Sequence, residues 1–93
     1  MGFTKDSAVE KAKSDLARRL NVPESEIELS SVKDKEFPDM SLGSPESGEM
    51  SAQMISSGWE ITLGAQDKTY DYRADKYQLR LHNFKGSNHI IKG

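Results

Sequence analysis

Alternation of apolar and polar residues over positions 59–81 restricts the fold more than any other feature of this chain. Turn-forming residues interrupt the alternation twice, at 64–68 and at 75–76. Because successive side chains of a strand point to opposite faces, each run places its apolar residues on one face of a sheet. The pattern predicts a three-stranded antiparallel meander, whose apolar face is made by Trp59, Ile61, Leu63, Tyr70, Tyr72, Tyr77, Leu79 and Leu81.

A helix is predicted over residues 7–20. Its start has the form of a capping box, Ser7-Ala8-Val9-Glu10, and its end is marked by Asn21 and Pro23. The charged residues of the segment, Asp15 among them, fall largely off the apolar face and are expected in solvent. Steps of three and four residues place the apolar side chains on one face, which consists of Val9, Ala12, Leu16 and Leu20.

A first strand is predicted after the helix, with a bulge near Ser30-Ser31, because Ile27 and Leu29 alternate with polar residues and Val32 follows a break in the period. The expected fold class is α+β: one N-terminal amphipathic helix packed on a four-stranded antiparallel sheet, in the chain order α-β-long loop-β-β-β. The length of 93 residues suits a single domain over 1–93. Residues 1–6 and 85–93 are expected to be flexible termini.

Composition excludes several classes of partner. The 13 basic and 15 acidic residues are interspersed and give a formal net charge of -2, which argues against nucleic-acid binding. No apolar run approaches the roughly 20 residues of a membrane span. The chain has no cysteine, so a disulfide is impossible. We expect no cofactor, and a monomer or weak dimer. The expected location is the cell envelope or outside the cell if a signal peptide was removed, and otherwise the cytoplasm.

Residues 38–58 break the pattern of regular elements. They hold two of the three prolines, three of the seven glycines and three of the four methionines. Loops longer than about 12–15 residues are usually either functional or disordered, and both interpretations stay open here. If the loop binds a protein or peptide, flexible apolar side chains and a Gly-Ser-Pro turn would form the contact. The expected ligand-binding residues are Met40, Leu42, Gly43, Ser44, Pro45, Met50, Met54 and Trp59.

Three functions remain possible, and a non-enzymatic binding or inhibitory module that presents this loop is the first. A carrier of a small ligand or soft metal ion is the second, with the loop methionines and His82 as ligands. A structural domain without a ligand is the third. Catalysis is not expected, because the two histidines, His82 and His89, lie near the C-terminus and are poorly placed as a base for Ser44.

The runs 58–63 and 68–75, with the order of the elements, resemble small bacterial and archaeal envelope domains of unknown function over residues 8–82. The most specific motif is Ser41-Leu42-Gly43-Ser44-Pro45. The resemblance implies a cysteine where Ser44 stands and another near His82, so the loop would be tethered less firmly in this chain, which has neither. More loosely, the chain is similar to the PepSY-type domains of protease propeptides, which implies binding to a protease or another envelope protein.

Overall fold

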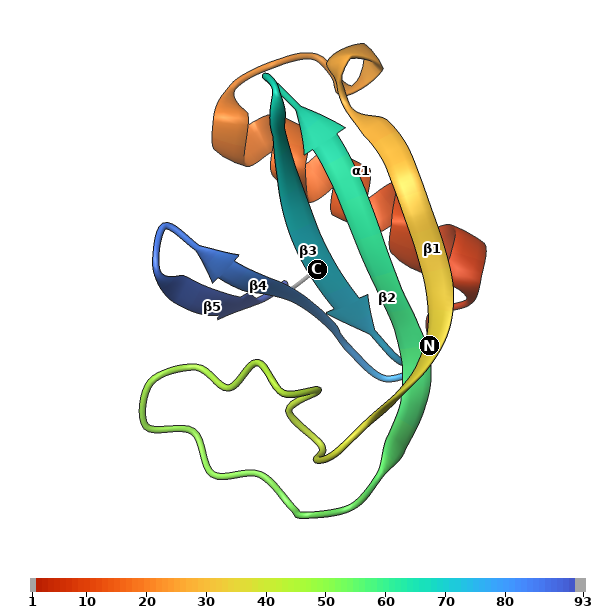
Figure 1. Ribbon diagram of the computed structural model, residues 1–93, viewed down its shortest axis with the longest axis vertical. Helices are drawn as coiled ribbons and strands as arrows, with labels where there is room; N and C mark the ends of the chain where they lie inside the picture. Colours follow the sequence, from red (N-terminus) through yellow and green to blue (C-terminus); the bar gives the residue numbers. More distant parts are fainter. Residues whose placement is uncertain (1, 92–93) are drawn as a thin grey trace.

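The computed structural model describes residues 2–91 and shows an α+β fold with one helix and a five-stranded antiparallel sheet (Figure 1). The sheet is a meander in the order β1-β2-β3-β4-β5, and α1 runs along one of its faces (Figure 1). The elements are α1 (Lys5–Leu20), the short 3-10 helix η1 (Glu24–Glu26), β1 (Glu28–Phe37), β2 (Ser56–Ala65), β3 (Lys68–Ala74), β4 (Leu79–Phe84) and β5 (Ser87–Ile90).

The helix begins earlier than the sequence predicted. Thr4 is the N-cap: its hydroxyl oxygen accepts a hydrogen bond from the Ser7 backbone N–H at 3.1 Å, and the Ser7 side chain accepts from the Thr4 N–H at 2.9 Å. The predicted capping box at Ser7 was therefore wrong, because Ser7 is the third helical residue of a box that starts at Thr4. The predicted end was confirmed, since Asn21 adopts the left-handed conformation at φ 57°.

The predicted bulge and meander were confirmed. The register between β1 and β2 shifts between Leu29 and Ser31, and β2 pairs with β3 across the two-residue turn Gln66-Asp67. The last predicted strand starts only at Leu79, so Tyr77 lies in the turn between β3 and β4 with an exposed side chain. The chain after Asp75 must first reverse direction, which uses the residues that the alternation assigned to the strand.

The predicted number of four strands was wrong, because Ser87–Ile90 forms β5 beside β4. Lys85 and Gly86 both have positive φ, as in a two-residue hairpin turn. Few apolar residues mark this strand, and a partner distant in sequence adds to its hairpin pairing with β4. The Ile90 N–H donates to the Glu46 carboxylate at 2.9 Å. Residues 1 and 92–93 of the predicted flexible termini lie outside the described residues.

The apolar core lies between α1 and the sheet, as the two periodicities predict. Asp15, however, is buried there and not in solvent. Its carboxylate accepts hydrogen bonds from the Tyr72 hydroxyl at 2.7 Å, from Arg18 at 2.8 Å and from Arg19 at 2.7 Å. These donors offset the cost of removing the charge from water. The buried apolar residues of the helix and central strands include Ala8, Ala12, Leu16, Ile61, Leu63, Tyr72, Leu79 and Leu81.

The opposite face of the sheet, which we call the polar face, carries charged side chains. Pairing places Lys33 beside Glu60, Arg73 beside Arg80, and Asp71 beside His82. Phe37 is buried but does not belong to the core beneath α1. The segment 38–55 lies next to β4 and β5 (Figure 1) and contacts this face through residues described below. The sheet therefore has a helix on one face and an irregular segment on the other.

Candidate functional site

The loop, residues 38–55, is bound to the sheet by hydrogen bonds to its backbone from side chains of β3 and of the turn after it. The Arg73 guanidinium donates to the Leu42 carbonyl at 3.1 Å, and the Gln78 side chain donates to the Met40 carbonyl at 2.6 Å. Such bonds satisfy backbone groups that no regular secondary structure pairs. The loop therefore has a defined path across the sheet.

A turn within the loop is organised by Asp39. Its carboxylate accepts hydrogen bonds from the Ser41 hydroxyl at 2.6 Å, the Ser41 N–H at 2.9 Å and the Gly43 N–H at 3.1 Å. The bond from the Ser41 hydroxyl, with that from the Gly43 N–H, lowers the pKa of Asp39 below its ordinary value of 3.8. Leu42 and Gly43 both have positive φ within this turn. The turn directs the Leu42 side chain into a fully buried position.

Arg80 and Glu49 form an ion pair between the loop and the sheet. Both terminal guanidinium nitrogens of Arg80, Nη1 and Nη2, donate to the Glu49 carboxylate, at 2.5 and 2.7 Å, and Nη1 also donates to the Ser44 carbonyl at 3.2 Å. The Arg80 side chain is only 5% exposed. Hydrogen bonding to Arg80 lowers the pKa of Glu49 from 4.5 to about 2. A bidentate pair of this kind is stronger than most surface ion pairs because it is shielded from water.

Ser44 and His82 are in direct contact, contrary to the expectation that His82 is poorly placed relative to Ser44. The Ser44 oxygen lies 2.8 Å from His82 Nδ1, although the residues are 38 positions apart. Because the Ser44 side chain is fully buried and Nδ1 is its one hydrogen-bond partner within residues 2–91, its hydrogen has an acceptor only when Nδ1 is unprotonated. The ring hydrogen of neutral His82 therefore sits on Nε2.

This contact holds the loop and does not expose a nucleophile. The buried Ser44 hydroxyl cannot reach a substrate in this conformation. Asp71 pairs with His82 across the strands, but its hydrogen-bond donor is Arg73 at 3.2 Å. The two positions at which the resemblance implied a cysteine pair are thus joined by a hydrogen bond. The loop is tethered at that point without a disulfide.

Replacing His82 with asparagine is expected to make the free energy of unfolding less sensitive to pH below 6.5. Burial, and then the charge of Arg73, lower the pKa of His82 from 6.5 in the folded protein. The unfolded chain therefore takes up the proton first as the pH falls through 6.5, and the wild-type protein loses stability. The asparagine oxygen can still accept the Ser44 hydrogen but cannot titrate.

Urea denaturation of both proteins between about pH 8 and about pH 5 measures this difference. Carboxylates titrate in both proteins, so the comparison isolates the imidazole. An equal decline of stability in the two proteins would contradict the role given to His82.

An apolar groove lies where the loop returns to β2. Its sides are Met54 and Ile55 from the loop end and Tyr77 from the turn between β3 and β4, with Met40 and Trp59 also lining it. The hollow has a volume of about 420 Å³. Met54 is 63% exposed, Ile55 70% and Tyr77 72%. Large exposed apolar side chains that gather at one place are typical of interaction sites.

The structure does not bring the predicted site residues together in one place. Met40, Met54 and Trp59 line the groove, whereas Leu42 and Ser44 are fully buried between the loop and the sheet. Gly43 belongs to the turn at Asp39, the Pro45 carbonyl accepts a hydrogen bond from Asn88, and Met50 is 96% exposed away from the groove. The predicted site did not include Ile55 or Tyr77. The sequence predicts the turn at Asp75-Lys76 but starts the next strand at Tyr77, whereas β4 starts only at Leu79.

The methionines and His82 are distributed over different places in the structure. Met40 and Met54 line the groove, Met50 does not line it, and His82 contacts Ser44. Within residues 2–91, no three His, Asp or Glu side chains group closely enough to hold a metal ion. In the same part of the chain, no helix has both the length and the apolar character needed to cross a membrane.

The family model of a domain of unknown function, DUF8738, matches residues 9–82. The match begins inside α1 and ends at His82 in β4, so it includes the loop and both sides of the groove. No curated protein and no solved structure matches the chain.

Proposed function

Because the chain belongs to the DUF8738 family of domains of unknown function, we propose its role from its surface: it is a non-enzymatic binding module that captures an apolar segment of a protein or peptide. The observation that carries this proposal is the groove between the loop end and the turn after β3. A protease or another envelope protein is the kind of partner that the resemblance of the sequence suggests, and binding could inhibit it.

The two sides of the groove are held together by one buried carboxylate. Asp75 accepts a hydrogen bond from the Ser56 hydroxyl at 2.7 Å on one side, and from the Tyr77 N–H at 2.8 Å and the Gln78 N–H at 3.0 Å on the other. Asp75 is almost fully buried. The positions of Ile55 and Tyr77 are therefore set before a partner arrives, which reduces the entropy lost on binding.

The methionines add adaptability to this frame. Met40 is placed by its N–H, which donates to the Ala52 carbonyl at 3.0 Å, and by its carbonyl, which accepts from Gln78. Met54 lies near the other end of the loop, and its side chain is exposed. Methionine side chains are unbranched and polarisable, so they can fit aliphatic or aromatic groups of different shape. A fixed backbone with flexible apolar side chains favours short apolar peptide segments as ligands.

Replacing Met54 with glutamate is expected to weaken peptide binding about tenfold or more, since burying a methionine side chain contributes about 1.5–3 kcal/mol. The probe is a set of peptides selected from a random displayed library on the wild-type protein, then synthesised and measured by fluorescence polarisation. The matched control is Met50→Glu, which changes the same residue type in the same loop at a position outside the groove.

Selected peptides should carry large apolar residues, and Met50→Glu should bind them like the wild-type protein. Equal loss of affinity in both variants would show that general surface charge and not the groove controls binding. A library that yields no apolar peptide would favour a structural domain without a ligand.

A further inference from the structure

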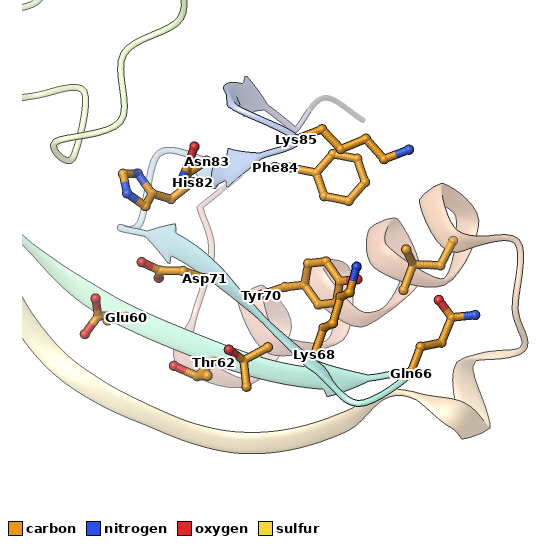
Figure 2. Close-up of a pocket in the computed structure, with 12 residues that line it drawn as sticks. Glu60, Thr62, Gln66, Lys68, Tyr70, Asp71, His82, Asn83, Phe84 and Lys85 are labelled. Carbon is orange, nitrogen blue, oxygen red and sulfur yellow. The ribbon is translucent and has the colours of Figure 1, made fainter.

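A second hollow, which we call the cleft, lies where β3 and β4 separate. The ladder between β3 and β4 extends only from the pair Asp71 and His82 to the pair Ala74 and Leu79. Residues 68–70 of β3 therefore have no pairing partner in β4. The hollow has a volume of about 740 Å³, within the range of about 300–1,000 Å³ that is usual for small-molecule sites. Figure 2 shows Asp71, His82 and Glu60 at one end of this cleft and Tyr70, Phe84, Lys68 and Lys85 at the other.

The backbone at Asn83 opens the cleft. Asn83 has a positive φ of 54°, its N–H is bonded to the Asn88 side chain at 2.8 Å, and the register between β4 and β5 shifts between Leu81 and Phe84. A shift of this kind bends a strand and changes the side to which the next residues point. Phe84 thereby packs beside Tyr70, with ring centres 6.0 Å apart, and against the core on the helix side. The result is a bent β4 with two aromatic rings beside the opening.

The acidic residues of the cleft are already paired. Glu60 contacts Lys35 at 3.5 Å, and Asp71 contacts Arg73 at 3.2 Å. The Oδ1 atom of Asp71 is buried and has no hydrogen-bond partner in the described part of the chain, so it does not face the open space. These carboxylates add little net negative charge to the cleft, because each has a basic neighbour.

The lysines at the other end are not paired. Across residues 2–91, neither Lys68 nor Lys85 has a carboxylate within 4.0 Å, although the Lys85 ammonium lies 5.4 Å from the centre of the Phe84 ring. His82 contributes an Nε2–H donor at the inner end, since its Nδ1 accepts from Ser44. The charged groups of the cleft without an ion pair are therefore the two lysines, and the His82 Nε2–H, the rings of Tyr70 and Phe84 and the uncharged side chains of Thr62, Gln66, Thr69 and Asn83 complete its lining. The lysines and the Nε2–H attract an acceptor or an anion.

We propose that the cleft between β3 and β4 binds a small molecule that combines a planar apolar ring with one anionic group. The ring lies against Tyr70 and Phe84, and the anionic group is held by Lys68 and Lys85. This site is separate from the apolar groove and independent of the proposed capture of peptides. A carboxylate and a phosphate satisfy the same requirement, and the two are distinguished by the choice of probe.

The test is a titration of the isotope-labelled protein, followed by the amide signals of residues that line the cleft. Phenylacetate and phenyl phosphate carry the ring with an anion, phenethylamine carries the ring with a cation, and acetate carries the anion alone. We expect saturable shifts at Lys68, Tyr70 and Phe84 with the first two probes, at millimolar affinity, which corresponds to about 4 kcal/mol of binding. Phenethylamine and acetate should produce no saturable shift there.

The variant for this test is Lys68→Gln combined with Lys85→Gln, with Lys76→Gln in the turn between β3 and β4 as control, since Lys76 does not line the cleft. Loss of two exposed charge pairs should weaken the binding of phenylacetate about tenfold, and Lys76→Gln should leave it unchanged. Unchanged signals with both ring anions would overturn the proposal. Equal affinity for phenethylamine, or undiminished binding by the double variant, would overturn it as well, because the lysines would then have no part in recognition.

Discussion

Gly58→Ala is expected to lower the free energy of unfolding by about 3 kcal/mol or more, a larger loss than Gly64→Ala in the same strand. A Cβ atom at Gly58 would overlap the Ala74 carbonyl oxygen and lie 2.9 Å from the carbonyl carbon and 3.0 Å from the Asp75 Cα. All three atoms belong to the backbone. No side chain can rotate away, so β2 and the end of β3 must move apart.

The loss is steric and not conformational, because the φ of Gly58 lies outside the left-handed range. Asp75 immediately follows the crowded carbonyl and connects both sides of the apolar groove. The substitution should therefore also distort the groove. Thermal unfolding followed by circular dichroism should show a midpoint lower by on the order of 15 °C, given the usual relation for domains of this size.

Gly64→Ala is the matched control. Gly64 lies in the same strand, and the atoms nearest to its added methyl group are the Ser30 hydroxyl at 3.4 Å and the Lys68 carbonyl at 3.9 Å, which are ordinary contacts. This variant should unfold within a few degrees of the wild-type protein. Similar midpoints for the two variants would show that β3 does not approach β2 as closely at Gly58 as the structure indicates.

Glu49→Gln is expected to cost about 2–3 kcal/mol of stability at neutral pH, because it leaves the Arg80 charge in a site that water barely reaches. The Arg80 side chain is 5% exposed, and its remaining acceptors would be the Ser44 carbonyl and the Gln78 side chain. Glutamine can accept one hydrogen bond but carries no charge. The loop should open more often as a result, which amide hydrogen exchange at Leu42 and Ser44 would measure.

The difference between the variant and the wild-type protein should shrink in acid. The pKa of Glu49 is lowered from 4.5 to about 2 in the folded protein, so its contribution is complete above 4.5 and is lost as the pH falls towards 2. Chemical denaturation of both proteins over that range measures this. Glu36→Gln is the control, since Glu36 is exposed and makes no ion pair in the described structure. A difference that stayed constant with pH would rule out the Arg80 pair as its source.

The loop shows why its function could be suspected from sequence while its geometry could not. Its length and its methionines marked it as unusual, but the contact of Ser44 with His82 joins residues 38 positions apart. Glu49 meets Arg80 across 31 positions. The residues next to Ser44 and Glu49 in the sequence contain no pattern that predicts these partners. Contacts of this kind depend on how the strands are placed, so a reading of neighbouring residues could not find them.

The groove and the cleft follow the same rule. Tyr77 was assigned to a strand by its alternation with Leu79, and only the turn that Asp75 organises exposes it beside Met54. Phe84 and Tyr70 line one opening because Asn83 bends β4. Because side chains alternate between the two faces of a strand, a shift of one residue moves the side chains that follow it to the other face. Single residues in unusual conformations thus decided which side chains share a surface.

The sequence by itself determined the α+β class, the helix end at Asn21, the bulge near Ser30 and the meander of β2 to β4. Each of these depends on interactions between near neighbours: side-chain periodicity, capping and turn preference. Tertiary structure decided the burial of Asp15 beneath Tyr72 and the attachment of the loop by Arg80 and His82, and it adds the Glu46 contact that supports the fifth strand. In those places a partner distant in sequence, besides near neighbours such as Arg18 and Arg19 at Asp15, compensates the removal of a polar group from water.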